Sequence, residues 1–140
     1  MFKHNWGFAA AFMVLVLIAP ACSRTPSGTQ ANLGQEFSLA IGQSAVVSGE
    51  DLGIKFVEVI GDSRCPKKVT CIWAGQASMT VMFTQNDSTY RMALVEPGLG
   101  DGPSQETFMQ YRISYRLLPY PEEGGKITQD QYRLSLAISK

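Results

Sequence analysis

The chain has 140 residues, which is enough for one domain with its own hydrophobic core. Its 12 basic and 12 acidic side chains give a formal net charge of +0, so the chain lacks the basic excess of nucleic-acid-binding proteins and we expect no nucleic-acid partner. The single histidine is His4, which excludes from the rest of the chain the catalytic triads and metal sites that need an imidazole.

Residues 1–21 have the pattern of a secretory signal peptide. Lys3 lies in a short positive segment, and Phe8–Ala19 is an apolar run of 12 residues. That run is shorter than the roughly 20 residues that span a bilayer. Ala21 and Cys22 then resemble a bacterial lipobox, which predicts that Cys22 is acylated and becomes the mature N-terminus. The alternative is ordinary signal-peptidase cleavage, which leaves Cys22 first but without lipid.

These features predict a protein of the bacterial cell envelope that is anchored to a membrane by acyl chains on Cys22 and faces the periplasm or the exterior. Ser23 favours sorting to the outer membrane if the host is Gram-negative. Residues 22–35 contain few large apolar side chains and no periodicity. We therefore interpret them as a flexible tether to a domain that spans residues 36–140.

After residue 35, apolar and polar side chains alternate with a period of two, which is typical of half-buried β-strands. The alternation predicts strands over residues 36–41, 54–59, 77–83, 90–94, 109–117 and 132–138. A change of phase near residues 56–58 predicts a β-bulge. No segment has a sustained helical period, so we expect an antiparallel β-sandwich of the immunoglobulin-like type, with a small closed β-barrel as the alternative.

Cys65 and Cys71 remain when Cys22 is set aside, and an even pair in an oxidising compartment favours a disulfide. Their spacing does not match the C-x-x-C pattern of a redox-active dithiol, and a zinc site normally needs four ligands. The ring that this disulfide closes is short, so the expected stabilisation is roughly 2–2.5 kcal/mol. We therefore predict a structural disulfide.

The disulfide lies within a distinctive run, because residues 62–77 read D-S-R-C-P-K-K-V-T-C-I-W-A-G-Q-A. This run resembles a D-S-R-C-P-x4-C-x-W-A-G-x-A motif of small, uncharacterised bacterial secreted proteins and lipoproteins. L-L-P-Y-P at residues 117–121 resembles a tail motif of the same family. The resemblance implies an all-β extracytoplasmic domain, and it brings no known activity that would assign a functional residue.

The disulfide-closed loop has two interpretations. In the first, it presents Arg64, Lys67 and Lys68 to an anionic partner, with Trp73 beside them as a further binding residue. In the second, which we favour at this stage, the lysines are solvated and Trp73 covers one end of the core. Asp62 and Arg64 are expected to pair across the neck of the loop, and such an exposed pair contributes at most about 1 kcal/mol.

The sequence predicts no catalytic residue, no metal site and no cofactor. Glu50-Asp51 and Glu122-Glu123 are adjacent acidic pairs, but both lie in turn-like sequence where solvated charge is the expected state. We expect a non-catalytic binding or structural module whose partner is an unidentified envelope protein or polymer. The alternatives are a protease-inhibitor-like protein and, less favoured, a hydrolase that uses carboxylates alone.

Overall fold

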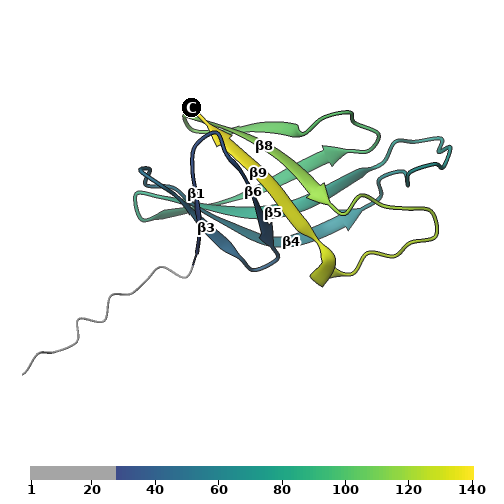
Figure 1. The fold of residues 1–140 in the computed structure, drawn as a ribbon, viewed down its shortest axis with the longest axis horizontal. Helices are drawn as coiled ribbons and strands as arrows, with labels where there is room; N and C mark the ends of the chain where they lie inside the picture. Colours follow the sequence, from purple (N-terminus) through teal and green to yellow (C-terminus); the bar gives the residue numbers. More distant parts are fainter. Residues whose placement is uncertain (1–27) are drawn as a thin grey trace, which may run out of the picture.

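The computed structural model describes residues 28–140 (Figure 1). The predicted signal peptide, the predicted lipidation site Cys22 and tether residues 22–27 lie outside the described residues. Within residues 28–140, no helix is long and apolar enough to cross a membrane.

The described residues form two packed β-sheets, which confirms the predicted β-sandwich and not the closed barrel. The larger sheet has the strand order β1-β3-β4-β5-β6 and the smaller sheet the order β2-β9-β8-β7. The strands are β1 (Thr29–Ala31), β2 (Glu36–Ala40), β3 (Ser44–Val47), β4 (Gly53–Asp62), β5 (Gln76–Gln85), β6 (Ser88–Pro97), β7 (Ser104–Phe108), β8 (Tyr111–Leu118) and β9 (Arg133–Ser139). A 3-10 turn, η1 (Gln129–Gln131), precedes β9. All strand pairs are antiparallel except β1 with β3.

The core lies between the sheets and is filled by the apolar side chains that alternate along each strand. Burying one large apolar side chain stabilises the fold by about 1.5–3 kcal/mol. Phe83 of the larger sheet stacks on Phe108 of the smaller sheet, with ring centroids 4.5 Å apart. The largest fully buried side chains are Tyr111, Tyr115, Phe56, Phe83, Leu39, Leu52, Ile54, Met79, Leu94, Ile113, Leu117 and Leu134.

The domain begins earlier than the sequence pattern predicts. Thr29–Ala31 pairs with β3 as an edge strand, and Ala31 is buried in the core. Gly34 N–H donates a hydrogen bond to the carbonyl oxygen of Ile138. Residues 29–35 therefore belong to the domain and not to the predicted tether. Backbone pairing at a sheet edge needs no apolar alternation, so composition alone did not reveal this strand.

The strands also differ from prediction in the region before β8. Met109 has φ 51° and a half-exposed side chain, so the strand predicted to begin there begins two residues later, at Tyr111. Met109 lies between β7 and β8, and β7 is a short, mostly exposed strand that the alternation did not predict. The predicted bulge is confirmed, because the register of β4 on β5 shifts between Phe56 and Glu58.

Three loops lie at one end of the sandwich, on the right in Figure 1: β4–β5 (residues 63–75), β6–β7 (98–103) and β8–β9 (119–132). We call this end the loop end. The loops are hydrogen-bonded to one another, because Gly98 N–H donates to the Gly75 carbonyl and Lys67 N–H donates to the Pro121 carbonyl. Gly28, the first described residue, lies toward the opposite end beside Ser44.

Candidate functional site

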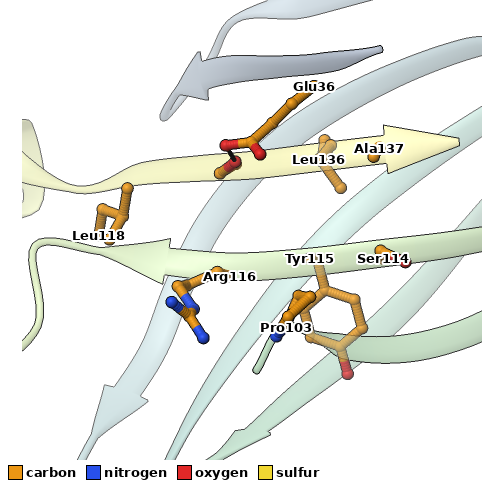
Figure 2. A pocket seen from close by; sticks show the side chains of 9 residues that line it. Glu36, Pro103, Ser114, Tyr115, Arg116, Leu118, Leu136 and Ala137 are labelled. Carbon is orange, nitrogen blue, oxygen red and sulfur yellow. Dashed lines mark hydrogen bonds between the residues drawn. The ribbon is translucent and has the colours of Figure 1, made fainter. Parts of the chain in front are cut away.

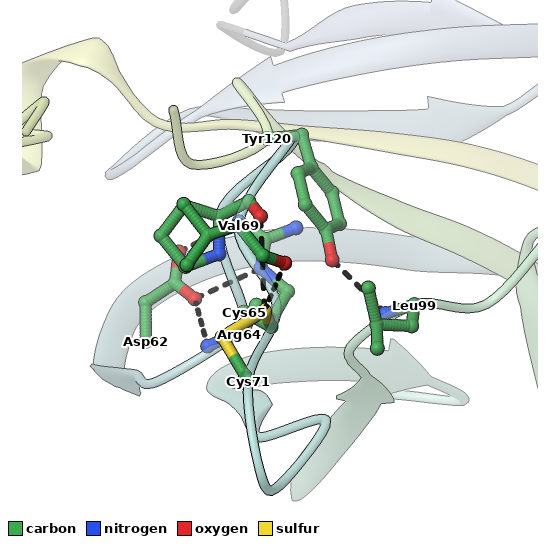
Figure 3. The surroundings of a disulfide bond; sticks show 8 residues. Asp62, Arg64, Cys65, Val69, Cys71, Leu99 and Tyr120 are labelled. Carbon is green, nitrogen blue, oxygen red and sulfur yellow. Dashed lines mark hydrogen bonds and ion pairs between the residues drawn. A yellow bond between two sulfur atoms is a disulfide. The ribbon is translucent and has the colours of Figure 1, made fainter. Parts of the chain in front are cut away.

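The side chain of Arg64 is buried at the loop end, two residues after β4, and is 3% exposed. Its Nε and Nη2 donate hydrogen bonds to the two carboxylate oxygens of Asp62, at 2.8 and 2.6 Å (Figure 3). Nη1 donates to the carbonyl oxygen of Leu117 at 2.8 Å, and Nη2 donates to that of Pro119 at 3.1 Å. The guanidinium therefore joins the end of β4 to the end of β8, which belongs to the other sheet.

Two further side chains from other segments enclose the guanidinium. Oε2 of Glu96, on β6, lies 3.6 Å from Nη1 of Arg64 and also accepts a hydrogen bond of 2.6 Å from the Leu117 N–H. The ring of Tyr120, from the β8–β9 loop, lies over the guanidinium with its centroid 4.8 Å from the Arg64 carbon Cζ. One buried cation thus contacts three strand ends and the loop that follows β8.

This geometry corrects two predictions made from the sequence. The Asp62–Arg64 pair was expected at the surface, but the Arg64 side chain is fully buried and that of Asp62 is nearly so. Arg64 was also a candidate binding residue, and its burial removes it from any surface that a partner could touch. A buried cation is stable only when fixed acceptors replace its hydration, and the two carbonyl acceptors, Leu117 and Pro119, lie far along the chain from Arg64.

The two carboxylates beside Arg64 respond to burial in opposite ways. Burial raises the pKa of Glu96 above its ordinary value, and the Leu117 N–H and the charge of Arg64 only partly offset this. Burial also acts to raise the pKa of Asp62, but hydrogen bonds from Arg64 and Tyr132 and the Arg64 charge outweigh it and leave that pKa below its ordinary value. Of the two carboxylates beside the guanidinium, Asp62 therefore keeps its negative charge to lower pH.

The predicted disulfide is confirmed. Cys65 and Cys71 are bonded with their Cα atoms 6.0 Å apart, and the Cys65 side chain is buried directly beside the guanidinium site (Figure 3). A disulfide of this kind persists in oxidising compartments, so it indicates that the protein is extracytoplasmic. The bond closes the base of the β4–β5 loop next to the residue that joins the two sheets.

Close backbone contacts fix the rest of the β4–β5 loop. Cys65 N–H donates to the Ala74 carbonyl, which closes the loop across its neck. A Cβ on Gly75 would lie 1.8 Å from the Ser63 carbonyl oxygen, and one on Gly98 would lie 1.9 Å from the Ala74 carbonyl oxygen. Only glycine permits these approaches. Because Gly75 and Gly98 have no side chain, residues 74 and 75 can lie directly against both the neck of the loop and the end of β6.

Trp73 does not cover the core, so this part of the interpretation that we favoured from the sequence is wrong. Its side chain is 82% exposed, and the neighbouring Ile72 is 93% exposed. The chain returns to the sheet only at Gln76, so residues 72 and 73 remain in the loop. The reason is steric, because Arg64 and Cys65 are buried at this end and the backbone contacts at Gly75 hold residues 72 and 73 outside. We call Ile72 and Trp73 the apolar tip.

Lys67 and Lys68 are exposed on the same loop, as predicted. Neither forms an ion pair with another residue of the described part of the chain. Nζ of Lys67 lies 5.7 Å from the centroid of the Tyr120 ring. Three of the four predicted binding residues are therefore exposed on the β4–β5 loop, and the fourth, Arg64, is buried.

Glu50 and Asp51 contact separate partners. Glu50 accepts a hydrogen bond from the Tyr111 hydroxyl and forms an ion pair with Lys140, while Asp51 accepts one from the Asn86 N–H. Among residues 28–140, no group of three or more His, Cys, Asp or Glu side chains is arranged to hold a metal ion.

Sequence reasoning missed several residues of the site. Two of them are Leu99, which is 58% exposed, and Tyr120. A hydrogen bond of 2.9 Å from the Leu99 N–H to the Tyr120 hydroxyl oxygen connects the β6–β7 loop to the β8–β9 loop. Glu96 was missed although it continues the phase of Met92 and Leu94, which face the core, and this phase was the signal of a buried carboxylate. The prolines that flank Tyr120 were the one signal that pointed to it.

Comparison of the chain with protein-family models, with curated proteins and with solved structures gives no match. The resemblance of residues 62–77 to a motif of bacterial secreted proteins and lipoproteins therefore stays a prediction.

Replacing Arg64 with Met should lower the free energy of unfolding by about 3–5 kcal/mol, because the substitution leaves Asp62 buried without its cation. Lys67→Met is the matched control, since it removes an exposed cation from the same loop and should change stability by no more than about 0.5 kcal/mol. Urea unfolding of the full chain, with the disulfide intact, measures both. Equal effects of the two substitutions would contradict the assigned role of Arg64.

Asp62→Asn and Glu96→Gln should change the pH dependence of stability in opposite directions. Because the pKa of Glu96 is raised, its carboxylate takes up a proton at a higher pH in the folded state than in the unfolded chain. The free energy of unfolding of wild type therefore increases as pH falls toward the ordinary pKa of 4.5. Glu96→Gln should remove that gain. Because the pKa of Asp62 is lowered, its contribution is present above the ordinary value of 3.8 and is lost as pH falls further.

The advantage of wild type over Glu96→Gln should therefore grow between neutral pH and pH 4.5, while its advantage over Asp62→Asn should shrink below pH 3.8. Urea unfolding across this range measures both differences. Curves that stay parallel to wild type at every pH would show that neither carboxylate titrates in the environment described.

Proposed function

We propose that the protein is a lipid-anchored, non-catalytic binding module of the bacterial cell envelope, and that it presents the apolar tip to a partner. The export signal and Cys22 in the sequence support the anchor, and the disulfide supports the compartment. In a Gram-negative host, Ser23 supports an outer-membrane location. The partner is an envelope protein or polymer.

The observation that carries this proposal is the exposure of Ile72 and Trp73 on a loop that is otherwise fixed. Trp is enriched among the residues that dominate binding energies, because its large ring buries much area at little cost in conformational entropy. A loop already held by a disulfide and by close backbone contacts loses less entropy when it binds. Exposed apolar groups on a rigid support are what a binding surface needs.

The position of the tip also fits presentation. Thr29 is in register with Ala45, and Ala45 with Ile54 near the start of β4, whereas the tip follows the far end of β4. An anchor that precedes Gly28 therefore connects at the end of the sandwich opposite the apolar tip (Figure 1). The loop end stays free to meet a partner while the protein is held on a membrane.

Site-specific photo-crosslinking tests the proposal. The photoreactive residue p-benzoylphenylalanine replaces Trp73 in the full chain, in cells that export the protein, and replaces Thr89 in the control. Thr89 is exposed on β6 toward the opposite end of the sandwich. We expect an adduct from position 73, none from position 89, and a weaker adduct when Cys65→Ser and Cys71→Ser release the loop. The absence of an adduct at position 73, or equal adducts at both positions, would refute the proposal.

A further inference from the structure

The depression on the outer face of the smaller sheet does not favour any class of ligand (Figure 2). It has a volume of about 260 Å³, and the charged residues that line it are Glu36 and Arg116, so its charges cancel. The Glu36 carboxylate also accepts a hydrogen bond of 2.6 Å from the Ser135 hydroxyl. The apolar tip, in contrast, presents side chains of a definite chemistry.

The apolar tip fits a pocket in a protein better than it fits a polymer. The side chains of Ile72 and Trp73 are almost fully exposed, so nearly all of their surface is available for contact. A sugar polymer offers hydroxyl groups and flat ring faces, which suit an indole ring but not the aliphatic side chain of Ile72. A hydrophobic pocket of a protein accommodates both side chains. Of the two partner classes in the proposed function, the tip therefore favours the protein.

The peptide bond between Trp73 and Ala74 lies between two segments that are both tied to Cys65. On the N-terminal side, Cys71 is joined to Cys65 by the disulfide. On the C-terminal side, the Ala74 carbonyl oxygen accepts a hydrogen bond of 2.8 Å from the Cys65 N–H. Cys65 is itself buried. A cut after Trp73 would therefore leave both new chain ends attached to one fixed residue.

Further contacts hold the segment that follows Trp73. The Gly75 carbonyl oxygen accepts a hydrogen bond of 2.9 Å from the Gly98 N–H, and the Gln76 carbonyl oxygen accepts one of 2.8 Å from the Ser63 N–H. Ala74 also packs directly against Gly98 at the end of β6. None of these contacts depends on the peptide bond between residues 73 and 74. Residues 74–76 therefore keep their position when that bond is cut.

We infer that the apolar tip is an inhibitory loop for a serine endopeptidase that cleaves after large aromatic residues, and that Trp73 enters the specificity pocket of the protease. The pocket of such an enzyme is a hydrophobic slot. Inhibitors of this kind bind with little change of shape, and a loop that is fixed in advance loses little entropy on binding. This inference rests on the proposed binding function and narrows its partner to a protease.

The tied ends make cleavage of the loop reversible. The serine hydroxyl oxygen of the protease bonds to the Trp73 carbonyl carbon, the bond from that carbon to the Ala74 nitrogen breaks, and the serine proton passes to the nitrogen. In an ordinary substrate the new amine diffuses away and water hydrolyses the ester. Here the amine stays beside the ester, so it attacks the same carbon, re-forms the peptide bond and returns the proton to the serine. The loop therefore occupies the protease without being consumed.

Inhibition of chymotrypsin by the full chain, measured with a chromogenic peptide substrate, tests the inference. Wild type should inhibit, and Trp73→Ala should weaken inhibition about a hundredfold, as expected when the residue that fills the pocket is removed. Ile60→Ala is the matched control, because Ile60 is an exposed apolar residue of β4, and it should change the inhibition constant less than twofold. Trp73→Lys should lose inhibition of chymotrypsin and gain inhibition of trypsin, whose pocket binds basic side chains.

Removal of the disulfide tests the tied ends separately. Cys65→Ser combined with Cys71→Ser should convert the loop from an inhibitor into a substrate, because one of the new ends is then released. Mass spectrometry should show that chymotrypsin cuts this variant after Trp73 at least tenfold faster than it cuts wild type. The buried Tyr115 should stay uncut while the domain is folded. Trp73→Lys keeps the disulfide, so it decides the question even if the disulfide-free variant is cut at buried positions.

Three outcomes would overturn the inference: no inhibition of chymotrypsin by wild type, no inhibition of trypsin by Trp73→Lys, or cleavage of wild type after Trp73 as fast as that of the disulfide-free variant. A crosslink at position 73 in cells together with any of these outcomes would refute the protease and leave the proposed binding function standing. A crosslink to lipid or polysaccharide would also overturn the inference, because its partner is a protein.

Discussion

The buried guanidinium of Arg64 is the interaction on which the loop end of this protein depends. It joins the end of β4 to the end of β8 across the two sheets, and it lies opposite Glu96 from β6 and beneath the ring of Tyr120. A charge with no exposure to water is stable only because each partner is in place. The positions of the three loops are therefore coupled to one another through a single side chain.

The exposure of the apolar tip follows from that coupling. Arg64 and Cys65 take the buried positions at the end of the sandwich, and the glycine contacts hold residues 74 and 75 against the neck of the loop and the end of β6. Trp73 has no place left in the core. The stability of the loop end and the exposure of the apolar tip thus come from the same set of contacts.

The sequence was sufficient for features that local pattern determines. Period-two alternation predicted the sandwich and most strands, and the parity and spacing of the cysteines predicted their disulfide. Arg64 and Trp73 were misread because the residues that decide their burial lie elsewhere. The carbonyl acceptors of Arg64 are 53 and 55 residues away, so no local pattern could show that an arginine, and not a tryptophan, occupies this position. Short edge strands such as β1 were not predicted for a different reason, since pairing of backbone groups at a sheet edge does not require a particular pattern of side chains.

Amide hydrogen exchange in the full chain tests most directly whether Arg64 holds the three loops together. The amides to follow are Lys67, which is bonded to the β8–β9 loop, and Gly98, which is bonded to the β4–β5 loop, with Val81 in β5 as an internal reference. In Arg64→Met, Lys67 and Gly98 should lose more protection than Val81, whose loss reports only the fall in global stability. If both amides stay as protected as in wild type, the loops are held by other contacts and Arg64 is not the residue that couples them.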